Sequence, residues 1–439
     1  MKSRSQILQE RYFLHLRLET EKQINKEITW LFREMFLDLF ASFKEIEDYR
    51  ARVDEYELNL LLVLLCIGIL WAGNNVSAIE EILTLNIGKV RYYLGLSVAE
   101  LPKVPSDTTL LECLAKVSWI QLLACVDEWL SKHISLSSKH IAVDGKAIRA
   151  CLEKCFGGTH PPYILNAFDV ENGVLRAQIA IDKKTNELGE MNNLFELLDL
   201  NGATVTIDAA GTNSEVVRAI VQSGGHCILP VKGNQKTLEE DLRLFFDEAR
   251  LYNTEIIHEY DDEDNGKRKH GRVDSRKYFI ITEGVEELLK DTAFEGLCHS
   301  VGMVIRERRI VRRDPVTNQL KMECSTQEVY YISDWDDRLS AQEFAGYVRD
   351  HWAGCEMIHY VLDTTFSEDL CRVRKGFSKQ NYALLRRLIY AMLTWIKKTI
   401  HYTKGYAILR QSLRDTCGCI MINNNEGSCA SECQYKAAS

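Results

Sequence analysis

Two short apolar runs, each with an aspartate near its end, constrain the fold of this chain more than any other feature. The first covers residues 139–146 and contains Asp144, and the second covers residues 203–210 and contains Asp208. Each run is rich in Val, Ile or Thr, and each aspartate precedes a small residue, which is typical of a buried strand ending in a turn. One such aspartate is ordinary, because its side chain suits turns. Two of them predict carboxylates at one edge of an α/β sheet, where such folds place their chemistry.

Two carboxylates held in this way can share divalent metal ions. Mg²⁺ takes oxygen ligands and needs only one or two protein carboxylates, because water and the phosphate oxygens of a substrate complete its shell. The sequence therefore predicts a Mg²⁺ site at Asp144 and Asp208.

Length and composition fit an ordinary globular protein. The 439 residues allow two or three domains, and the net charge of −9 argues against a wholly basic surface while permitting a local basic groove. Residues 1–10 lack the apolar core of a signal peptide, so we expect no secretion. The longest apolar stretch, residues 60–72, is too short to span a bilayer and predicts a buried helix. The fourteen cysteines follow no small-scaffold pattern and are most simply free thiols.

Helical patterns fill the first part of the chain, and strand patterns begin near residue 138. We expect helices at residues 191–200 and 214–222, and strands at residues 141–143, 163–168, 175–181, 205–207 and 227–231. The order of three strands, helix, strand, helix and strand resembles the ribonuclease-H-like arrangement. In that arrangement one acid ends the first strand, a second ends the fourth, and a third comes from a later helix.

Several short motifs, in order and spacing, resemble those of the H-repeat-associated insertion-sequence transposases, a branch of the DDE transposases. The resemblance covers residues 57–393, most of the chain. Its motifs are Val143–Lys146, Thr185–Glu187, Thr206–Ala209, Lys232–Gln235, His270–Arg272 with Arg276, His351–Trp352, His359–Asp363, Phe366–Asp369, Arg372–Arg374 and, in the helical region, Pro105–Thr109.

The resemblance implies a metal-dependent DNA transposase that cleaves DNA at the ends of an insertion sequence and transfers the strands. Asp144 and Asp208 would be its first two catalytic acids and would hold two Mg²⁺ ions, for which Mn²⁺ can substitute. Its partners would be double-stranded DNA, as element ends and target, and further copies of itself assembled on DNA. We expect no membrane partner and a cytoplasmic, nucleoid-associated location.

The predicted fold class is α/β: a ribonuclease-H-like mixed sheet with flanking helices, a helical N-terminal domain, and a β-rich insertion before the last catalytic helix. The predicted parts are a helical domain for binding DNA ends at 1–135, the first part of the core at 136–232, the insertion at 233–340, the helical remainder of the core at 341–413, and a cysteine-containing flexible tail at 414–439.

The third acid departs from the family pattern. The family motif His-Trp-Gly-Ile-Glu-Asn corresponds to residues 351–356, and Cys355 takes the place of its glutamate. Glu356 stands one residue later, and one helical step turns a side chain by about 100° and moves it about 1.5 Å along the axis. We take Glu356 as the third catalytic and metal-binding acid, with Asp363 as an alternative.

Several polar residues of the motifs are candidates for contact with DNA. They are Lys146, Lys232, Gln235, Arg272, Arg276, Arg372 and Arg374. Lys146 could instead be solvated after its strand, and charge runs are usually solvated surfaces. Arg386 and Arg387 could line a DNA groove or form the polar side of an amphipathic helix.

Three interpretations of function stay open. The first is an active transposase, supported by the motif series with Asp144 and Asp208 intact. The second is a catalytically inactive, transposase-derived DNA-binding protein, supported by Cys355. The third and weakest is a general nuclease on the same fold. We expect His359 to pack in the core, and the spacing of Cys417, Cys419, Cys429 and Cys433 argues against a standard zinc finger.

Overall fold

The computed structural model describes most of the chain and divides it into two compact units. Unit 1 comprises residues 1–134 and 360–439, and unit 2 comprises residues 135–359. The described residues are 4–52, 55–72, 75–133, 139–147, 163–181, 187–262, 268–269, 272–313, 319–402, 404–411 and 413–414. The tail cysteines and the motif residues 185–186 and 270–271 lie outside them. The five-part division of the sequence stays a prediction.

Unit 1 is helical. Its helices are α1 (Arg4–Ser42), α2 (Leu58–Ala72), α3 (Val76–Leu85), α4 (Ile87–Leu94), α5 (Asp107–Lys116), α6 (Trp119–His133) and α12 (Ser378–Thr399). Every residue of α2 from Leu58 to Trp71 is buried, as expected for its apolar run. The Asn381 amide on α12 donates to the carbonyls of Leu114 (2.9 Å) and Val117 (2.8 Å), so the late helix is hydrogen-bonded to the early ones.

No single helix among the described residues is both long and apolar enough to cross a membrane. Two pairs, α2 with α3 and α5 with α6, reach the required length and composition only together, and each pair is bent by 92°.

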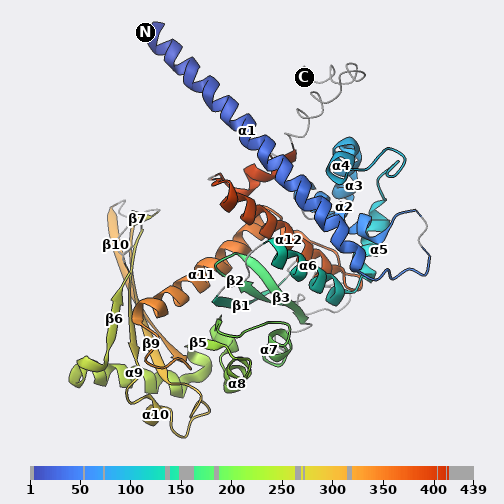
Figure 1. The fold of residues 1–439 in the computed structure, drawn as a ribbon. Coiled ribbons are helices and arrows are strands. Elements are labelled where there is room, and N and C mark those ends of the chain that lie inside the picture. Colours follow the sequence, from blue (N-terminus) through green and yellow to red (C-terminus); the bar gives the residue numbers. More distant parts are fainter. Residues whose placement is uncertain are drawn as a thin grey trace. The chain divides into compact units, whose positions relative to one another are not determined.

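The first strands of unit 2 confirm the ribonuclease-H-like order (Figure 1). Strands β3-β2-β1-β4-β5 lie side by side, with β1, β4 and β5 parallel and β2 antiparallel to both of its neighbours. The elements are β1 (His140–Ala147), β2 (Tyr163–Asp169), β3 (Val174–Ile181), α7 (Glu187–Phe195), β4 (Thr204–Ile207), α8 (Ser214–Gln222) and β5 (His226–Val231).

The segment after β5 extends the same sheet rather than forming a separate one. It continues from β5 in the order β10-β9-β8-β6, and β7 pairs with β8. Its elements are α9 (Lys236–Tyr252), β6 (His258–Asp261), β7 (Arg268–Lys269), β8 (Arg272–Ile281), α10 (Val285–Leu288), β9 (Ser300–Arg313) and β10 (Leu320–Ser333), followed by α11 (Ala341–Thr364). The predicted β-rich insertion is confirmed, although α9 was not expected from the sequence.

Helix α11 packs on one face of this extended sheet. Phe344 contacts Tyr278 of β8 and Tyr331 of β10 edge-on, with ring centroids 6.3 and 5.4 Å apart. A Cβ at Gly302 on β9 would collide with the Phe344 ring, so this position needs glycine for the helix to approach. The same helix carries the histidine motifs, and its packing sets their position over the sheet.

Candidate active site

The parallel pairing of β1 with β4 brings the two motif aspartates to neighbouring positions. The register ends at Val143 opposite Ile207, and Asp144 and Asp208 are the next residues on each strand. The prediction that Asp144 ends its strand is corrected, because β1 continues to Ala147 through antiparallel pairing with β2. Asp144 therefore marks the point where β1 leaves its parallel neighbour.

The Asp144 carboxylate is held on both oxygens. Its Oδ1 accepts a hydrogen bond from the Gly145 backbone N–H (2.8 Å), and its Oδ2 lies 3.4 Å from Nδ1 of His359 on α11. His359 is partly buried, with its ring edge-on to Phe168 at 6.2 Å. We expected His359 to pack in the core. The structure shows that its ring packs on Phe168 while its Nδ1 lies beside the Asp144 carboxylate, so packing is only part of its role.

Asp208 begins a short 3₁₀ turn at residues 209–211 and is half-buried. Among the described residues its carboxylate accepts no hydrogen bond and forms no ion pair. The turn is anchored from the loop after β5, where Asn234 donates to the Ala209 carbonyl (2.8 Å) and Gln235 donates to the Thr212 carbonyl (2.9 Å). The Lys232–Gln235 motif thus positions Asp208, a role that sequence reasoning missed for Gln235.

Three buried polar side chains, one each from β1, β4 and α11, contact one another beside the strand segments that precede Asp144 and Asp208. The Thr206 hydroxyl lies 2.8 Å from Nε2 of His140 on β1 and 2.8 Å from Nδ1 of His351 on α11. Burial, together with the neighbouring His351, lowers the pKa of His140 to about 3. Burial also lowers the pKa of His351 to about 4, with Lys232 acting in the same direction and Asp208 opposing. Both imidazoles are therefore neutral near pH 7.

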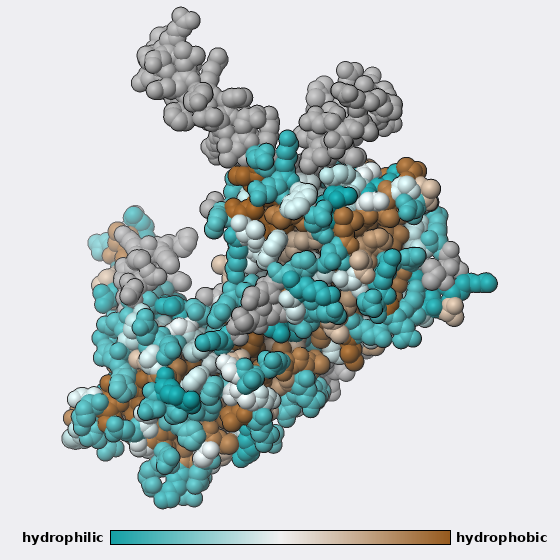
Figure 2. Space-filling view, in the orientation of Figure 1, coloured by the Kyte–Doolittle hydropathy of each residue, from teal (hydrophilic) through white to brown (hydrophobic). Residues whose placement is uncertain are grey.

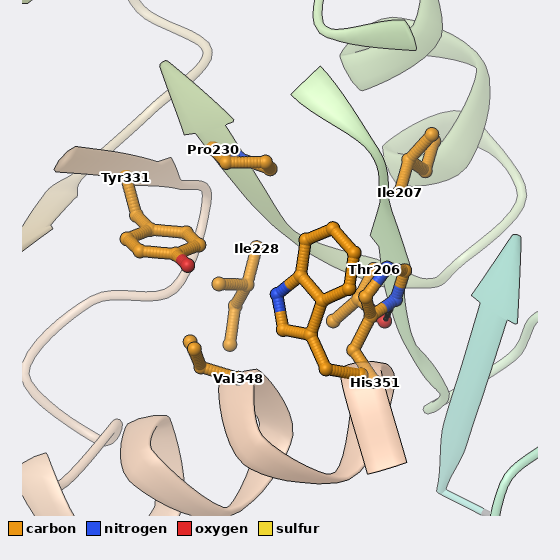
Figure 3. A pocket seen from close by; sticks show the side chains of 8 residues that line it. Thr206, Ile207, Ile228, Pro230, Tyr331, Val348 and His351 are labelled. Atoms are coloured by element: carbon orange, nitrogen blue, oxygen red, sulfur yellow. Dashed lines mark hydrogen bonds between the residues drawn. The ribbon is translucent and has the colours of Figure 1, made fainter. Parts of the chain in front are cut away.

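A small pocket opens beside these three side chains. Figure 3 shows His351 and Thr206 on one side of it and Tyr331 and Pro230 on the other. Trp352 also lines it, and the Lys232 ammonium lies 5.6 Å from the centre of the Trp352 ring. Lys232, a predicted DNA contact, therefore lies beside Trp352, and its charge acts on His351.

One face of α11 carries His351, Cys355 and His359, each four residues from the next. Four residues advance about 40° beyond a full turn, so the three side chains share a face. His351 and His359 contact β4 and β1 from this face, and Cys355 between them is 3% exposed. Cys355 thus faces the sheet at the place where the family pattern has glutamate.

Glu356 occupies the next position of α11, and its side chain lies outside the described part of the structure. Among the described residues, no group of three or more His, Cys, Asp or Glu side chains is arranged to hold a metal ion.

The structure places four other predicted residues, in different settings. Lys146 is 8% exposed, so the interpretation of a solvated lysine is wrong. Arg276 lies on β8 with its Nη1 3.9 Å from Asp262. Arg372 is exposed and Arg374 half-buried, and both belong to unit 1. The side chain of Arg272 lies outside the described set.

Both interpretations of Arg386 and Arg387 are wrong. Their side chains are each 1% exposed, so they neither line a groove nor form the polar side of a helix. Arg387 Nη1 donates to Glu368 Oε1 at 2.7 Å, and the Arg386 guanidinium lies 3.9 Å from the centre of the Tyr382 ring.

The strand order and the paired carboxylates define a ribonuclease-H-like protein of the DDE class. The family model described as "Transposase DDE domain" matches residues 135–392, and the chain belongs to this family. Domains of this family generally use divalent metal ions. The resemblance to the H-repeat-associated branch is confirmed by named relatives.

Two relatives from Escherichia coli (strain K12) match over 358 residues, which is 80% of this chain and 88% of each relative. "Putative protein YbfL" is 28% identical, and "H repeat-associated putative transposase YhhI" is 27% identical. The structure described as "Cryo-EM structure of piggyBac transposase synaptic complex with hairpin DNA (SNHP)" aligns with 92% of this chain and 82% of its own. The identity is 12% and the TM-score 0.41, which is too low to define a common fold.

Proposed function

We propose that this protein is a DDE-type transposase that cleaves DNA strands at insertion-sequence ends and transfers them to a target. The observation that carries the proposal is the β1–β4 register, which ends at Val143 and Ile207 and leaves Asp144 and Asp208 adjacent. Two carboxylates on neighbouring rigid strands are the minimum donor set for metal-assisted chemistry at a phosphodiester.

The donors present fit a hard divalent cation. The half-buried Asp208 carboxylate has no hydrogen-bond or ion-pair partner among the described residues, which leaves its oxygens available to a cation. Asp144 stands beside it on the adjacent strand. Mg²⁺ accepts two such carboxylates with water and substrate oxygens completing its shell, and Mn²⁺ accepts the same ligands. Two ions held by Asp144 and Asp208 would supply the chemistry that activates a water or 3′-hydroxyl and stabilises the leaving oxygen.

The remaining groups of the site bind and orient the DNA. The Asn234 and Gln235 amides hold the turn that carries Asp208, and His359 holds Asp144 from α11. Lys232 is half-buried, and its charge and that of Asp208 both act on His351, so its ammonium would pair with a phosphate and help to neutralise the phosphate charge. Lys146 and Gln235, and the arginines 272, 276, 372 and 374, stay proposed DNA contacts.

The second candidate is a catalytically inactive DNA-binding protein, and Cys355 is the observation that favours it. The thiol faces the sheet where the family has its glutamate, and a soft sulfur donor suits Mg²⁺ poorly. In the active alternative Glu356 serves as the third acid, which requires its carboxylate to reach the site from a position about 100° around the helix.

DNA cleavage distinguishes the two candidates. The substrate is a duplex carrying the flanking element ends, assayed with Mg²⁺ and with EDTA. Metal-dependent cleavage that disappears in Asp144→Ala supports the active transposase, with Glu356 or another acid completing the site. Cleavage that appears only in the double variant Cys355→Glu, Glu356→Asn supports the inactive candidate on a sound scaffold. Absence of cleavage in both proteins would contradict the proposed chemistry.

Assembly and location follow from the same proposal. Acting on two element ends calls for a homo-oligomer on DNA, and work on chromosomal DNA places the protein in the cytoplasm with the nucleoid.

A further inference from the structure

The outer part of the extended sheet forms a projecting arm, made of residues 272–277 of β8, 305–313 of β9 and 320–328 of β10. Strands β9 and β10 pair without interruption from Ser300–Ser333 to Arg313–Leu320. Their inner ends are buried, and their outer ends are half-buried or exposed. Figure 1 shows the arm extending past the end of α11, and Figure 2 shows a mainly hydrophilic surface over it.

The strand register divides the arm into two faces. Tyr278 and Val304 are paired on β8 and β9 and belong to the cluster packed against Phe344 and Val348 of α11, so they define the face on the α11 side. Alternate residues share a face. This face of the arm therefore carries Arg276, Arg306, Arg308, Arg312 and Lys321, against two acids, Asp274 and Glu323. We call it the basic face.

The positive charge of the basic face is only partly compensated. Arg306 stands directly opposite Arg276, an arrangement of like charges that costs stability across a strand pair. Arg276 shares the carboxylate of the buried Asp262 with Arg349, at 3.9 and 3.6 Å. Arg306 itself has no hydrogen bond or ion pair among the described residues. An excess of arginines held in register is suited to a partner carrying regularly spaced negative charge.

The opposite face of the arm has a different character. Its exposed side chains include Val311, Leu320 and Met322, and its Arg309 is paired with Glu307 at 3.3 Å. The basic residues therefore concentrate on the side of the sheet where α11 lies.

The basic face and the aspartates lie on the same side of one continuous sheet. Helix α11 contacts Tyr278 through Phe344 at one end and Asp144 through His359 further along. Four strand spacings, about 19 Å, separate β1 from β9 across the sheet. Base pairs follow every 3.4 Å along B-DNA, so about six base pairs of one duplex span that distance.

We infer that the basic face of the arm binds the phosphate backbone of duplex DNA, about six base pairs or more from the phosphate at Asp144 and Asp208. The inference rests on the proposed function for its substrate. It adds a second contact, which fixes the direction in which the duplex leaves the active site. Arginine suits this role because its planar guanidinium forms paired hydrogen bonds to phosphate.

The test compares two double variants of β9 that remove the same charge from opposite faces. Arg306→Ser with Arg312→Ser changes the basic face, and Arg309→Ser with Arg313→Ser is the matched control. Binding to a fluorescent duplex of about 40 base pairs is measured by anisotropy over a salt series, with about 0.9 of logarithmic slope expected per phosphate neutralised. EDTA is present throughout, so the result does not depend on cleavage.

We expect the basic-face variant to lower the salt slope by about 1.8 and the control to change it by less than half as much. Equal changes in the two variants, or no change in either, would overturn the inference. Tighter binding of single-stranded RNA or polyglutamate than of duplex DNA would also overturn the inference. If the slope falls as expected but the protein never cleaves DNA, DNA binding by the basic face is supported and the proposed catalysis is rejected. Melting temperatures show whether both variants fold.

Discussion

The two units each hold a group of charged motif residues, and the two groups are built for opposite purposes. In unit 2 the Asp144 and Asp208 carboxylates are partly exposed and stand on adjacent strands. In unit 1 the Glu368 carboxylate is fully buried and is bonded to Arg387, with Arg386 3.9 Å away. The carboxylates of the first group can bind a ligand, whereas the carboxylate and guanidinium charges of the second group neutralise one another. Residue type alone does not distinguish a site from a structural ion pair.

The largest expected effect lies in the buried group. Glu368→Gln leaves the Arg387 and Arg386 guanidinium groups buried without a counter-charge, which costs about 3–5 kcal/mol of unfolding free energy. Urea denaturation measures this loss. The control is Glu112→Gln, which removes an exposed ion pair with Lys116 and should leave stability unchanged. Equal effects of the two substitutions would remove the contrast between the units.

The stability of the Asp144 and Asp208 group should depend on bound metal rather than on an internal ion pair. At a Mg²⁺ concentration about 100 times the dissociation constant, the protein should gain about 2.7 kcal/mol of stability. Asp144→Asn should abolish this gain while leaving the metal-free melting temperature nearly unchanged, because the carboxylate is not a core group. Asp336→Asn, at a partly exposed ion pair with Arg338, serves as control. A gain that persists in Asp144→Asn would show that the ion binds elsewhere.

Acid should weaken unit 2 through the histidine beneath the site. The folded-state pKa of His140 is about 3, below its usual 6.5, because the ring is buried against Thr206, His351 and Tyr347. Between pH 6.5 and pH 3, His140 is therefore protonated in the unfolded chain and neutral in the folded protein. The contribution of neutral His140 to the free energy of unfolding is complete above pH 6.5 and is lost as the pH falls towards 3. At pH 5 the loss is about 2 kcal/mol.

Denaturation at pH 7.5 and pH 5 measures this loss. In His140→Gln the fall in stability between the two pH values should be smaller by the same amount. An unchanged fall would mean that His140 is protonated in the folded protein.

The smallest expected effect concerns the loop that supports Asp208. Gln235→Ala removes the hydrogen bond to the Thr212 carbonyl and should cost about 1 kcal/mol. Because Thr212 ends the turn after Asp208, the Mg²⁺-induced stabilisation should also decrease. Gln222→Ala, at the exposed end of α8, is the matched control. A stability loss without any change in metal response would make Gln235 a purely structural residue.

Much of unit 2 could be predicted because its signals are local. Alternating β-branched residues indicate the strands, and the position of Asp208 after β4 follows from where the apolar run stops. The extension of the sheet by β6 to β10 could not be predicted, because strand partners far apart in the chain are chosen by packing. The same holds for Lys146, whose burial depends on neighbours from other elements.

The arginines show the limit most clearly. Arg276, Arg306 and Arg387 look alike in the sequence as residues of basic or amphipathic segments. Arg387 is buried because Glu368, nineteen positions earlier, faces it across the fold. Arg306 stays unpaired among the described residues because the β8–β9 register sets Arg276, not an acid, opposite it.

The sequence by itself determined the order of the strands and helices from β1 to β5, the family, and the two aspartates, because these depend on side-chain periodicity and short motifs. Only the tertiary structure decided which charges face outward, that Cys355 faces the sheet, and that the arm has a basic face. The physical reason is that burial and pairing are properties of segments brought together by folding, and a charge acquires its role from what surrounds it.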